Sequence, residues 1–112
     1  MTNWIQSFTE TFPSELWSIE EEELTRYSRD AWPLAIKLSQ AGQTPYLPQV
    51  AFHPRFPDEV VKVLKWANQN RVPVTPWGAG SGVVGAALPV QGGILLDLSR
   101  LNKILVLDET NL

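Results

Sequence analysis

Apolar residues recur at helical spacing along the first part of the chain. Trp4, Ile5 and Phe8 make one apolar stripe, which predicts an amphipathic helix. Further along, Ser18 and Glu21 have the spacing of a capping box, and the acidic residues 20–23 would occupy the positive end of the helix dipole. We therefore expect a helical segment over residues 1–45.

After residue 45 the pattern changes to an alternation of strand and helix. Residues 50–53 predict a first strand, and a helix follows over residues 57–70, with Pro57 as its first residue and a buried stripe of Val60, Val61, Leu64 and Ala67. Short apolar runs predict three further strands, over residues 72–75, 94–98 and 104–107. This order predicts an α+β chain in which N-terminal helices precede a small β-α-β-β unit with a parallel or mixed sheet.

The second predicted strand leads into a loop built almost wholly from small residues. Glycines at 78, 80, 82 and 85 allow positive φ angles and the close approach of a bulky ligand. Their backbone N–H groups can converge on one anion. Between residues 72 and 99 there is no Lys, Arg or His and only one acid, Asp97, so a phosphate here would be held by amide dipoles and by the Ser81 hydroxyl. The ligand is expected at the carboxyl end of the strand.

The residues of this loop argue against three alternatives to a cofactor-binding loop. A ligand-free connection between two strands normally needs two to five residues, far fewer than this loop contains. Residues 80–85 match G-x-G-x-x-G, but Pro89 and the paired glycines after it leave too little room for the helix that such a motif must begin. A phosphate-binding Walker loop needs Lys and Ser or Thr after Gly85, where Ala86 and Ala87 stand.

The run from Pro73 to Gly82, followed by Gly85, residues 88–89, residues 92–102 and Ile104, resembles the flavin-binding signature of the FAD-linked oxidase family, the vanillyl-alcohol oxidase or p-cresol methylhydroxylase type. This family includes glycolate oxidase and D-lactate dehydrogenase flavoproteins. Residues 27–30, 48–54 and 58–70 resemble its Tyr-x-x-Asp element, first strand and following helix. The resemblance implies that residues 46–112 are the first half of an FAD-binding domain. It assigns cofactor binding to Pro76, Trp77, Gly78, Ala79, Gly80, Ser81, Gly82, Gly85 and Ala86.

Two positions depart from the family pattern. Trp77 stands where the family usually places Arg, so an aromatic ring that can stack on a ligand or fill the core replaces a charge. Ser81 stands where some relatives carry a histidine that bonds covalently to the flavin, and a serine hydroxyl cannot form that link. The resemblance therefore implies non-covalent, dissociable FAD.

Composition narrows the remaining chemistry. The chain has no cysteine and one histidine, which excludes disulfides, thiol catalysis and a His-rich metal centre. Its net charge of -3 predicts no nucleic-acid binding, and the absence of a long apolar run predicts a cytoplasmic protein without a transmembrane segment. His53 and Trp66 are interpreted as structural residues, and Tyr27 with Asp30 as a local hydrogen-bonded clamp. No residue is assigned a catalytic or metal-binding role.

Two functions of different classes follow. In the first, the chain is the FAD-binding portion of a flavin-dependent oxidoreductase that oxidises a 2-hydroxy acid such as glycolate or D-lactate, with catalytic residues outside these 112 positions. In the second, it is a stand-alone binding or assembly module derived from an FAD-binding half-domain. In both, an unpaired strand at residues 104–107 predicts that the chain needs the rest of the domain, another chain or self-association.

Overall fold

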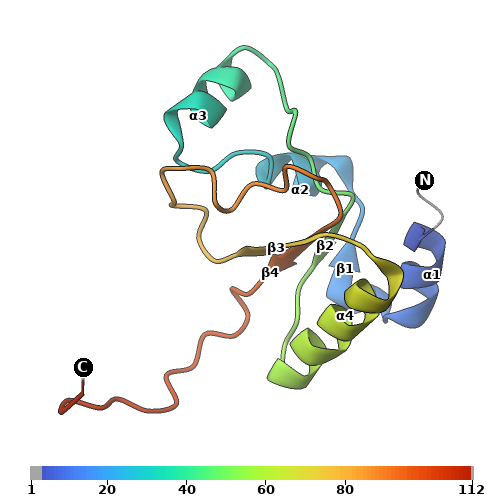
Figure 1. Ribbon diagram of the computed structural model, residues 1–112, viewed down its shortest axis with the longest axis vertical. Coiled ribbons are helices and arrows are strands. Elements are labelled where there is room, and N and C mark those ends of the chain that lie inside the picture. The colour runs from blue at the N-terminus through green and yellow to red at the C-terminus, as the bar shows by residue number, and fades with distance from the viewer. Residues whose placement is uncertain (1–3, 112) are drawn as a thin grey trace.

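A computed structural model describes residues 4–111, so residues 1–3 of the first predicted segment and residue 112 lie outside the description. The elements, in chain order, are α1 (Trp4–Thr11), the 3-10 turn η1 (Ser14–Leu16), β1 (Trp17–Ser18), α2 (Glu21–Arg26), α3 (Pro33–Gln40), β2 (Val50–Phe52), α4 (Pro57–Asn70), β3 (Val74–Trp77) and β4 (Ile94–Asp97) (Figure 1). The predicted α+β class, with helices first and a β-α-β-β unit after them, is confirmed. Within residues 4–111, no helix has both the length and the apolar character needed to cross a bilayer.

The four strands form one mixed sheet in the order β1-β2-β4-β3. β4 runs parallel to both of its neighbours, with Leu95 opposite Ala51 of β2 and opposite Thr75 of β3. β1 pairs antiparallel with β2. Because β2, β3 and β4 point the same way, their carboxyl ends meet at one edge of the sheet.

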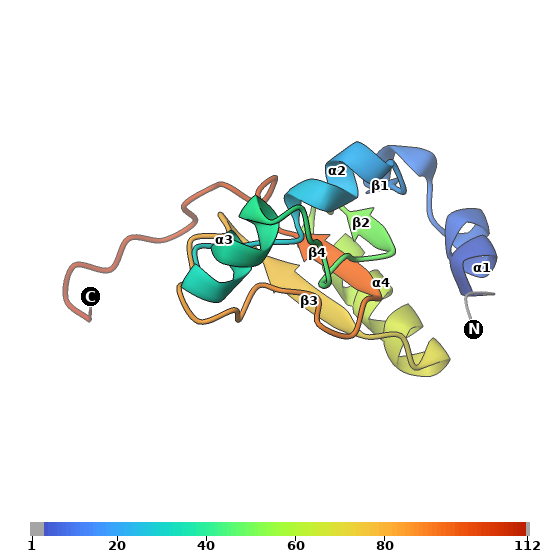
Figure 2. The same ribbon diagram turned by 90° about the horizontal axis from the view of Figure 1, so that it is seen from above.

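Alternate side chains of β2 and β4 enter two apolar layers. Val50, Phe52, Ile94 and Leu96 face the layer formed with α1 and α4, whereas Ala51 and Leu95 pack against Leu24 and Tyr27 from the α2 side. The two layers cover opposite faces of the sheet (Figure 2). Both faces of the central strands are therefore buried, which explains their continuous apolar runs.

An aromatic cluster fixes α1 on α4. The Phe8 ring is fully buried, with its centroid 5.2 Å from that of Trp66 and 5.8 Å from that of Phe52, both in edge-on geometry. Such pairs add about 0.5–1.5 kcal/mol beyond the burial of their surface. The predicted apolar stripe of the first helix and the packing role of Trp66 are confirmed.

The buried face of α4 is rotated relative to the predicted stripe. Val63, Trp66 and Ala67 are buried, while Val61 and Leu64 remain 50% and 44% exposed. Spacings of three and four residues both fit a helix, so the apolar positions of this sequence allow two stripes. The aromatic cluster around Trp66 decides between them.

The predicted capping box is also wrong. Ser18 belongs to β1 and pairs with β2, so it is held in an extended conformation before the helix begins. Its Oγ accepts a hydrogen bond from the Glu20 N–H at 3.1 Å, while Glu20, the N-cap residue of α2, makes no side-chain cap. The pairing of β1 with β2 therefore takes precedence over the local capping signal.

The strand predicted over residues 104–107 does not form. These four apolar residues are 78–87% exposed, and no described strand pairs with them. The chain after β4 runs away from the sheet as an extended segment (Figure 1). A β-strand requires a neighbouring strand for its hydrogen bonds, and an apolar run alone does not supply one.

Gly93 allows β4 to begin between its two neighbours. Its φ is +75°, its N–H donates to Gln49 Oε1 at 3.0 Å, and its carbonyl accepts from the Gln49 N–H at 2.8 Å. A Cβ at this position would stand 2.2 Å from the Pro73 carbonyl oxygen. Glycine is therefore required both by the backbone angle and by the space.

We expect Gly93→Ala to lower the free energy of unfolding by about 3 kcal/mol or more, because strain at positive φ and backbone overlap add together. Gly42→Ala is the matched control, since Gly42 has the same φ of +75° and nothing within 4 Å of a Cβ. It should cost only about 1–2 kcal/mol. Urea denaturation followed by tryptophan fluorescence measures both, and equal losses would show that the Pro73 contact does not matter.

Candidate functional site

The carboxyl edge of the sheet brings together residues at the ends of three strands and in the chain that follows them. His53 comes directly after β2, Gly78 after β3, and Asp97 ends β4. The antiparallel strand β1 leads into α2, which lies over the same sheet face as Ala51 and Leu95. This edge therefore gathers most of the candidate chemistry of the chain.

The nine predicted cofactor residues lie within residues 76–86 at this edge, interrupted by Val83 and Val84. Pro76 and Trp77 are the last residues of β3, and the other seven belong to the loop that connects β3 to β4. Ser81 is exposed in this loop. The structure places all nine at the end of β3 and in the loop after it, and their binding role stays a prediction.

The loop offers unused hydrogen-bond donors. Among the described residues, no N–H group of residues 78–87 donates a hydrogen bond, although the loop carbonyls of Gly82 and Gly85 accept bonds from Ala31 and Leu88. Backbone N–H groups normally find a partner, either within the protein or in solvent. Successive free amides can bind an anion where they converge on one point.

Two of the four loop glycines are required by tryptophan rings. A Cβ at Gly80 would stand 2.2 Å from the Trp77 indole, and a Cβ at Gly85 would stand 2.8 Å from the Trp32 indole. Both glycines also have positive φ, +66° and +81°. Their identity is thus explained by the packing of the chain itself.

The other two glycines leave open space. No atom lies within 4 Å of a Cβ placed on Gly78, and at Gly82 the only neighbour is Asp30 Oδ2 at 3.8 Å. Neither glycine has a positive φ. Protein packing therefore does not explain the choice of glycine at positions 78 and 82, whereas the approach of a ligand would explain it.

The segment after α2 supports the far side of the loop. The Ala31 N–H donates to the Gly82 carbonyl at 3.0 Å, and Asp30 Oδ1 accepts from the Trp32 N–H at 2.9 Å. Together with the Trp32 ring against Gly85, these contacts fix the path of the loop. The loop conformation thus depends on residues about fifty positions earlier in the sequence.

A second group of polar side chains lies at the same edge and is mostly buried. The Tyr27 hydroxyl donates to Asp97 Oδ2 at 2.6 Å, and Asp97 Oδ1 accepts from the Ser99 N–H at 2.9 Å. His53 Nε2 donates to Glu23 Oε1 at 2.5 Å, while its Nδ1 lies 3.6 Å from Asp97 Oδ2. The group links α2 to the ends of β2 and β4.

Burial and hydrogen bonding move the proton equilibria of the central pair apart. Burial raises the pKa of the Tyr27 hydroxyl, and its hydrogen bond to the Asp97 carboxylate raises that pKa further. Burial acts to raise the pKa of the Asp97 carboxyl as well, but hydrogen bonds from Tyr27 and Ser99 outweigh it and hold that pKa below its ordinary value. Tyr27 therefore remains a donor and Asp97 an acceptor at neutral pH.

This group was missed from the sequence, and the predicted clamp between Tyr27 and Asp30 is wrong. Tyr27 bonds to Asp97 instead, because the helix turns its side chain toward the sheet. Asp30 accepts a hydrogen bond from the Trp32 N–H. The partners of His53 are likewise distant in sequence, at Glu23 and Asp97. The available signal was that His53 and Asp97 both stand at the ends of predicted parallel strands, which meet at one edge.

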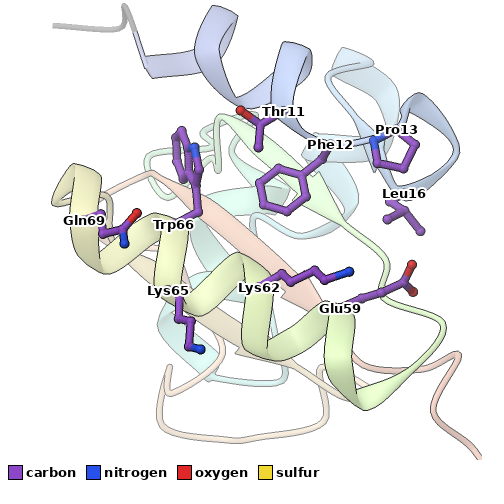
Figure 3. A pocket seen from close by; sticks show the side chains of 9 residues that line it. All are labelled: Thr11, Phe12, Pro13, Leu16, Glu59, Lys62, Lys65, Trp66 and Gln69. Atoms are coloured by element: carbon purple, nitrogen blue, oxygen red, sulfur yellow. The ribbon is translucent and has the colours of Figure 1, made fainter.

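A hollow of about 430 Å³ lies away from the glycine loop, between the α1–η1 turn and α4 (Figure 3). Phe12, Leu16 and Trp66 provide its apolar wall, and Lys62 and Lys65 of α4 are also among its lining residues. None of the nine predicted cofactor residues lines it.

Known proteins match the region that contains the loop. A family model described as "FAD binding domain" matches residues 48–112. The chain is 48% identical over 67 residues to an uncharacterized FAD-linked oxidoreductase of Mycobacterium tuberculosis, a match that covers 60% of this chain and 15% of that protein. A D-lactate dehydrogenase of Anaerostipes hadrus is 42% identical over 64 residues, covering 57% of this chain and 14% of that enzyme. The glycolate oxidase subunit GlcD of Bacillus subtilis is 35% identical over 86 residues, a match that covers 77% of this chain and 16% of that subunit.

Solved structures match nearly the whole chain. An alkyldihydroxyacetonephosphate synthase superimposes with a TM-score of 0.83 at 22% identity, over 98% of this chain and 23% of that one. A p-cresol methylhydroxylase superimposes with a TM-score of 0.71 at 25% identity, over 93% of this chain and 19% of that one. The chain thus spans a small part of each relative that it matches, 14–16% of the curated proteins above.

We expect Tyr27→Phe to lower the free energy of unfolding by about 1.5–3 kcal/mol at neutral pH, since it removes a hydrogen bond to a buried carboxylate. Because the pKa of Asp97 is lower in the folded than in the unfolded protein, the stability that this carboxylate contributes is complete above its ordinary pKa of about 3.9 and is lost as the pH falls through the folded-state pKa. The loss caused by Tyr27→Phe should therefore shrink in acid.

Urea denaturation across this pH range measures the effect. Tyr46→Phe serves as the control, because Tyr46 is half-buried and its hydroxyl has no hydrogen-bond partner among the described residues. A loss at Tyr27 that is independent of pH would contradict the role of the Asp97 carboxylate.

Proposed function

The chain belongs to the FAD binding domain family that residues 48–112 match, and from this premise we propose that it is the FAD-holding portion of a flavin-dependent oxidoreductase. The resemblance to FAD-linked oxidases of the p-cresol methylhydroxylase type is confirmed. The finer proposal is that the glycine loop after β3 holds the pyrophosphate, without a covalent link to the flavin.

The free amides of residues 78–87 are the observation that carries this proposal. A pyrophosphate needs several donors at one point, and the loop offers N–H groups, the Ser81 hydroxyl and two glycines whose Cα atoms face open space. The loop itself carries no cation, so binding would depend on amide dipoles. The residues that are present therefore fit the cofactor.

The proposed reaction is the oxidation of a 2-hydroxy acid, of the glycolate or D-lactate type. Support comes from relatives named as D-lactate dehydrogenase and as a glycolate oxidase subunit. When bound, the flavin supplies the hydride acceptor at N5. The part proposed for this chain is to bind and orient the cofactor, and no residue of it is assigned to substrate.

The second candidate function is a binding or assembly module without chemistry, in which the exposed apolar run at residues 104–107 would contact other protein. Surfaces of this kind are normally covered by other protein, so we propose that the rest of an FAD domain, another chain or a second copy covers this run. A visible absorption spectrum of the purified protein separates the two functions. Flavin absorption supports the first, and its absence after incubation with FAD supports the second.

We expect Gly82→Val to weaken FAD binding by at least about 100-fold, or roughly 2.7 kcal/mol, because its side chain fills space that the cofactor needs. The fold should tolerate the change, since φ is not positive there and the nearest atom to a new Cβ is 3.8 Å away. Flavin fluorescence titration measures binding, and thermal unfolding of the FAD-free protein measures the fold.

Gly80→Val is the contrasting variant. It should lower the unfolding temperature as well as the affinity, because a Cβ at Gly80 overlaps the Trp77 indole. If Gly82→Val titrates FAD like the parent protein, the loop is not the pyrophosphate site.

Ser81→Ala should weaken FAD by about 1.5–3 kcal/mol, because the variant loses one hydrogen bond to a charged phosphate oxygen. Ser81→Thr retains the hydroxyl and should bind like the parent. Acid precipitation provides the separate test of non-covalent binding, because dissociable flavin remains in the supernatant. Flavin retained in the washed pellet would show a covalent link.

A further inference from the structure

Asp30 carries a buried carboxylate oxygen without a hydrogen-bond partner. The residue is 3% exposed, and its Oδ1 accepts from the Trp32 N–H at 2.9 Å. Its Oδ2 is buried and has no partner among the described residues. Leaving a charged buried oxygen unpaired is costly, and such groups in native proteins call for an explanation.

This oxygen faces the glycine loop. It lies 3.8 Å from the position that a Cβ on Gly82 would occupy, at one of the two glycines that protein packing does not explain. The neighbouring Ala31 N–H holds the Gly82 carbonyl at 3.0 Å. The free amides, the open glycine and the unpaired oxygen therefore lie together on the same part of the loop.

The chemistry of a carboxylate limits what could pair with it. An ionised carboxylate only accepts hydrogen bonds, so its partner must carry an O–H or N–H group. Phosphate oxygens carry no such proton at neutral pH and would repel the carboxylate. In FAD, the donors next to the pyrophosphate are the hydroxyls of the ribityl chain on one side and of the adenosine ribose on the other.

We propose that Asp30 belongs to the cofactor site and that its Oδ2 accepts a hydrogen bond from a sugar hydroxyl of the bound dinucleotide. This inference rests on the proposed function, since it takes the loop as the pyrophosphate site. It adds a residue outside the glycine loop and a specific role, recognition of a hydroxyl group instead of the phosphates.

Asp30→Asn tests the proposal through two effects of opposite sign. The variant keeps Oδ1 for the Trp32 N–H and removes the unpaired charge, so the FAD-free protein should unfold at a temperature no lower than the parent. Its FAD affinity should fall about 10- to 100-fold, because the charged acceptor is lost. If the carboxylate made no contact with the ligand, removing a negative charge beside the pyrophosphate would leave binding equal or tighter.

Asp58→Asn is the matched control, because its side chain is 68% exposed on α4, far from the loop in sequence. It makes the same change of charge and should leave FAD affinity unchanged. Fluorescence titration with FAD, together with thermal unfolding without ligand, measures all three proteins. Unchanged or tighter FAD binding by Asp30→Asn overturns the proposal.

Ligand fragments identify the hydroxyl. If the ribityl chain is the donor, Asp30→Asn weakens FMN and leaves ADP unchanged. If the ribose is the donor, Asp30→Asn weakens the binding of ADP. The parent protein and the variant should then bind 2′-deoxy-ADP or 3′-deoxy-ADP, whichever lacks the donating hydroxyl, with equal affinity. An equal loss for FMN, ADP and both deoxy forms would show that Asp30 acts through the loop alone, and would overturn direct contact. A parent protein that binds no FAD would instead refute the proposed function itself.

Discussion

The parallel pairing of β4 with both β2 and β3 is the interaction on which the rest of the structure depends. Leu95 lies opposite Ala51 on one side and Thr75 on the other, so one buried strand fixes the positions of two others. Because all three strands point the same way, the residues at their carboxyl ends must meet. Both the glycine loop and the polar group around Asp97 therefore belong to one edge of the sheet.

The connection between β3 and β4 is the next consequence. Adjacent parallel strands need a long crossover, which a helix usually provides, and here residues 78–93 provide it without one. Helical hydrogen bonds would have used the amides, whereas this loop leaves those of residues 78–87 free. Its shape is fixed from outside instead, by the Trp77 ring over Gly80 and the Trp32 ring over Gly85.

The buried polar group explains how the N-terminal segment becomes part of this site. Two residues of the α2 region bond to the sheet edge. Tyr27 bonds to Asp97 at the end of β4, and Glu23 bonds to His53, which follows β2. Because the chain continues from Tyr27 directly to residues 30–32, fastening α2 to the sheet edge also places Asp30 and Trp32 against the loop. The support of the loop is thus built from hydrogen bonds that cross most of the sequence.

The sequence by itself determined the α+β class, the bounds of α4, the approximate positions of β2, β3 and β4, and the place of the glycine loop. These features could be predicted because hydrophobic periodicity, proline and glycine act on the local backbone. Tertiary structure alone decided which stripe of α4 is buried, that Ser18 joins a strand instead of capping a helix, and that residues 104–107 remain unpaired. It also decided that Tyr27 and His53 meet Asp97 and that Asp30 faces Gly82. Each of these outcomes depends on whether a segment distant in sequence lies alongside and which segment it is, and no local pattern of residues encodes that.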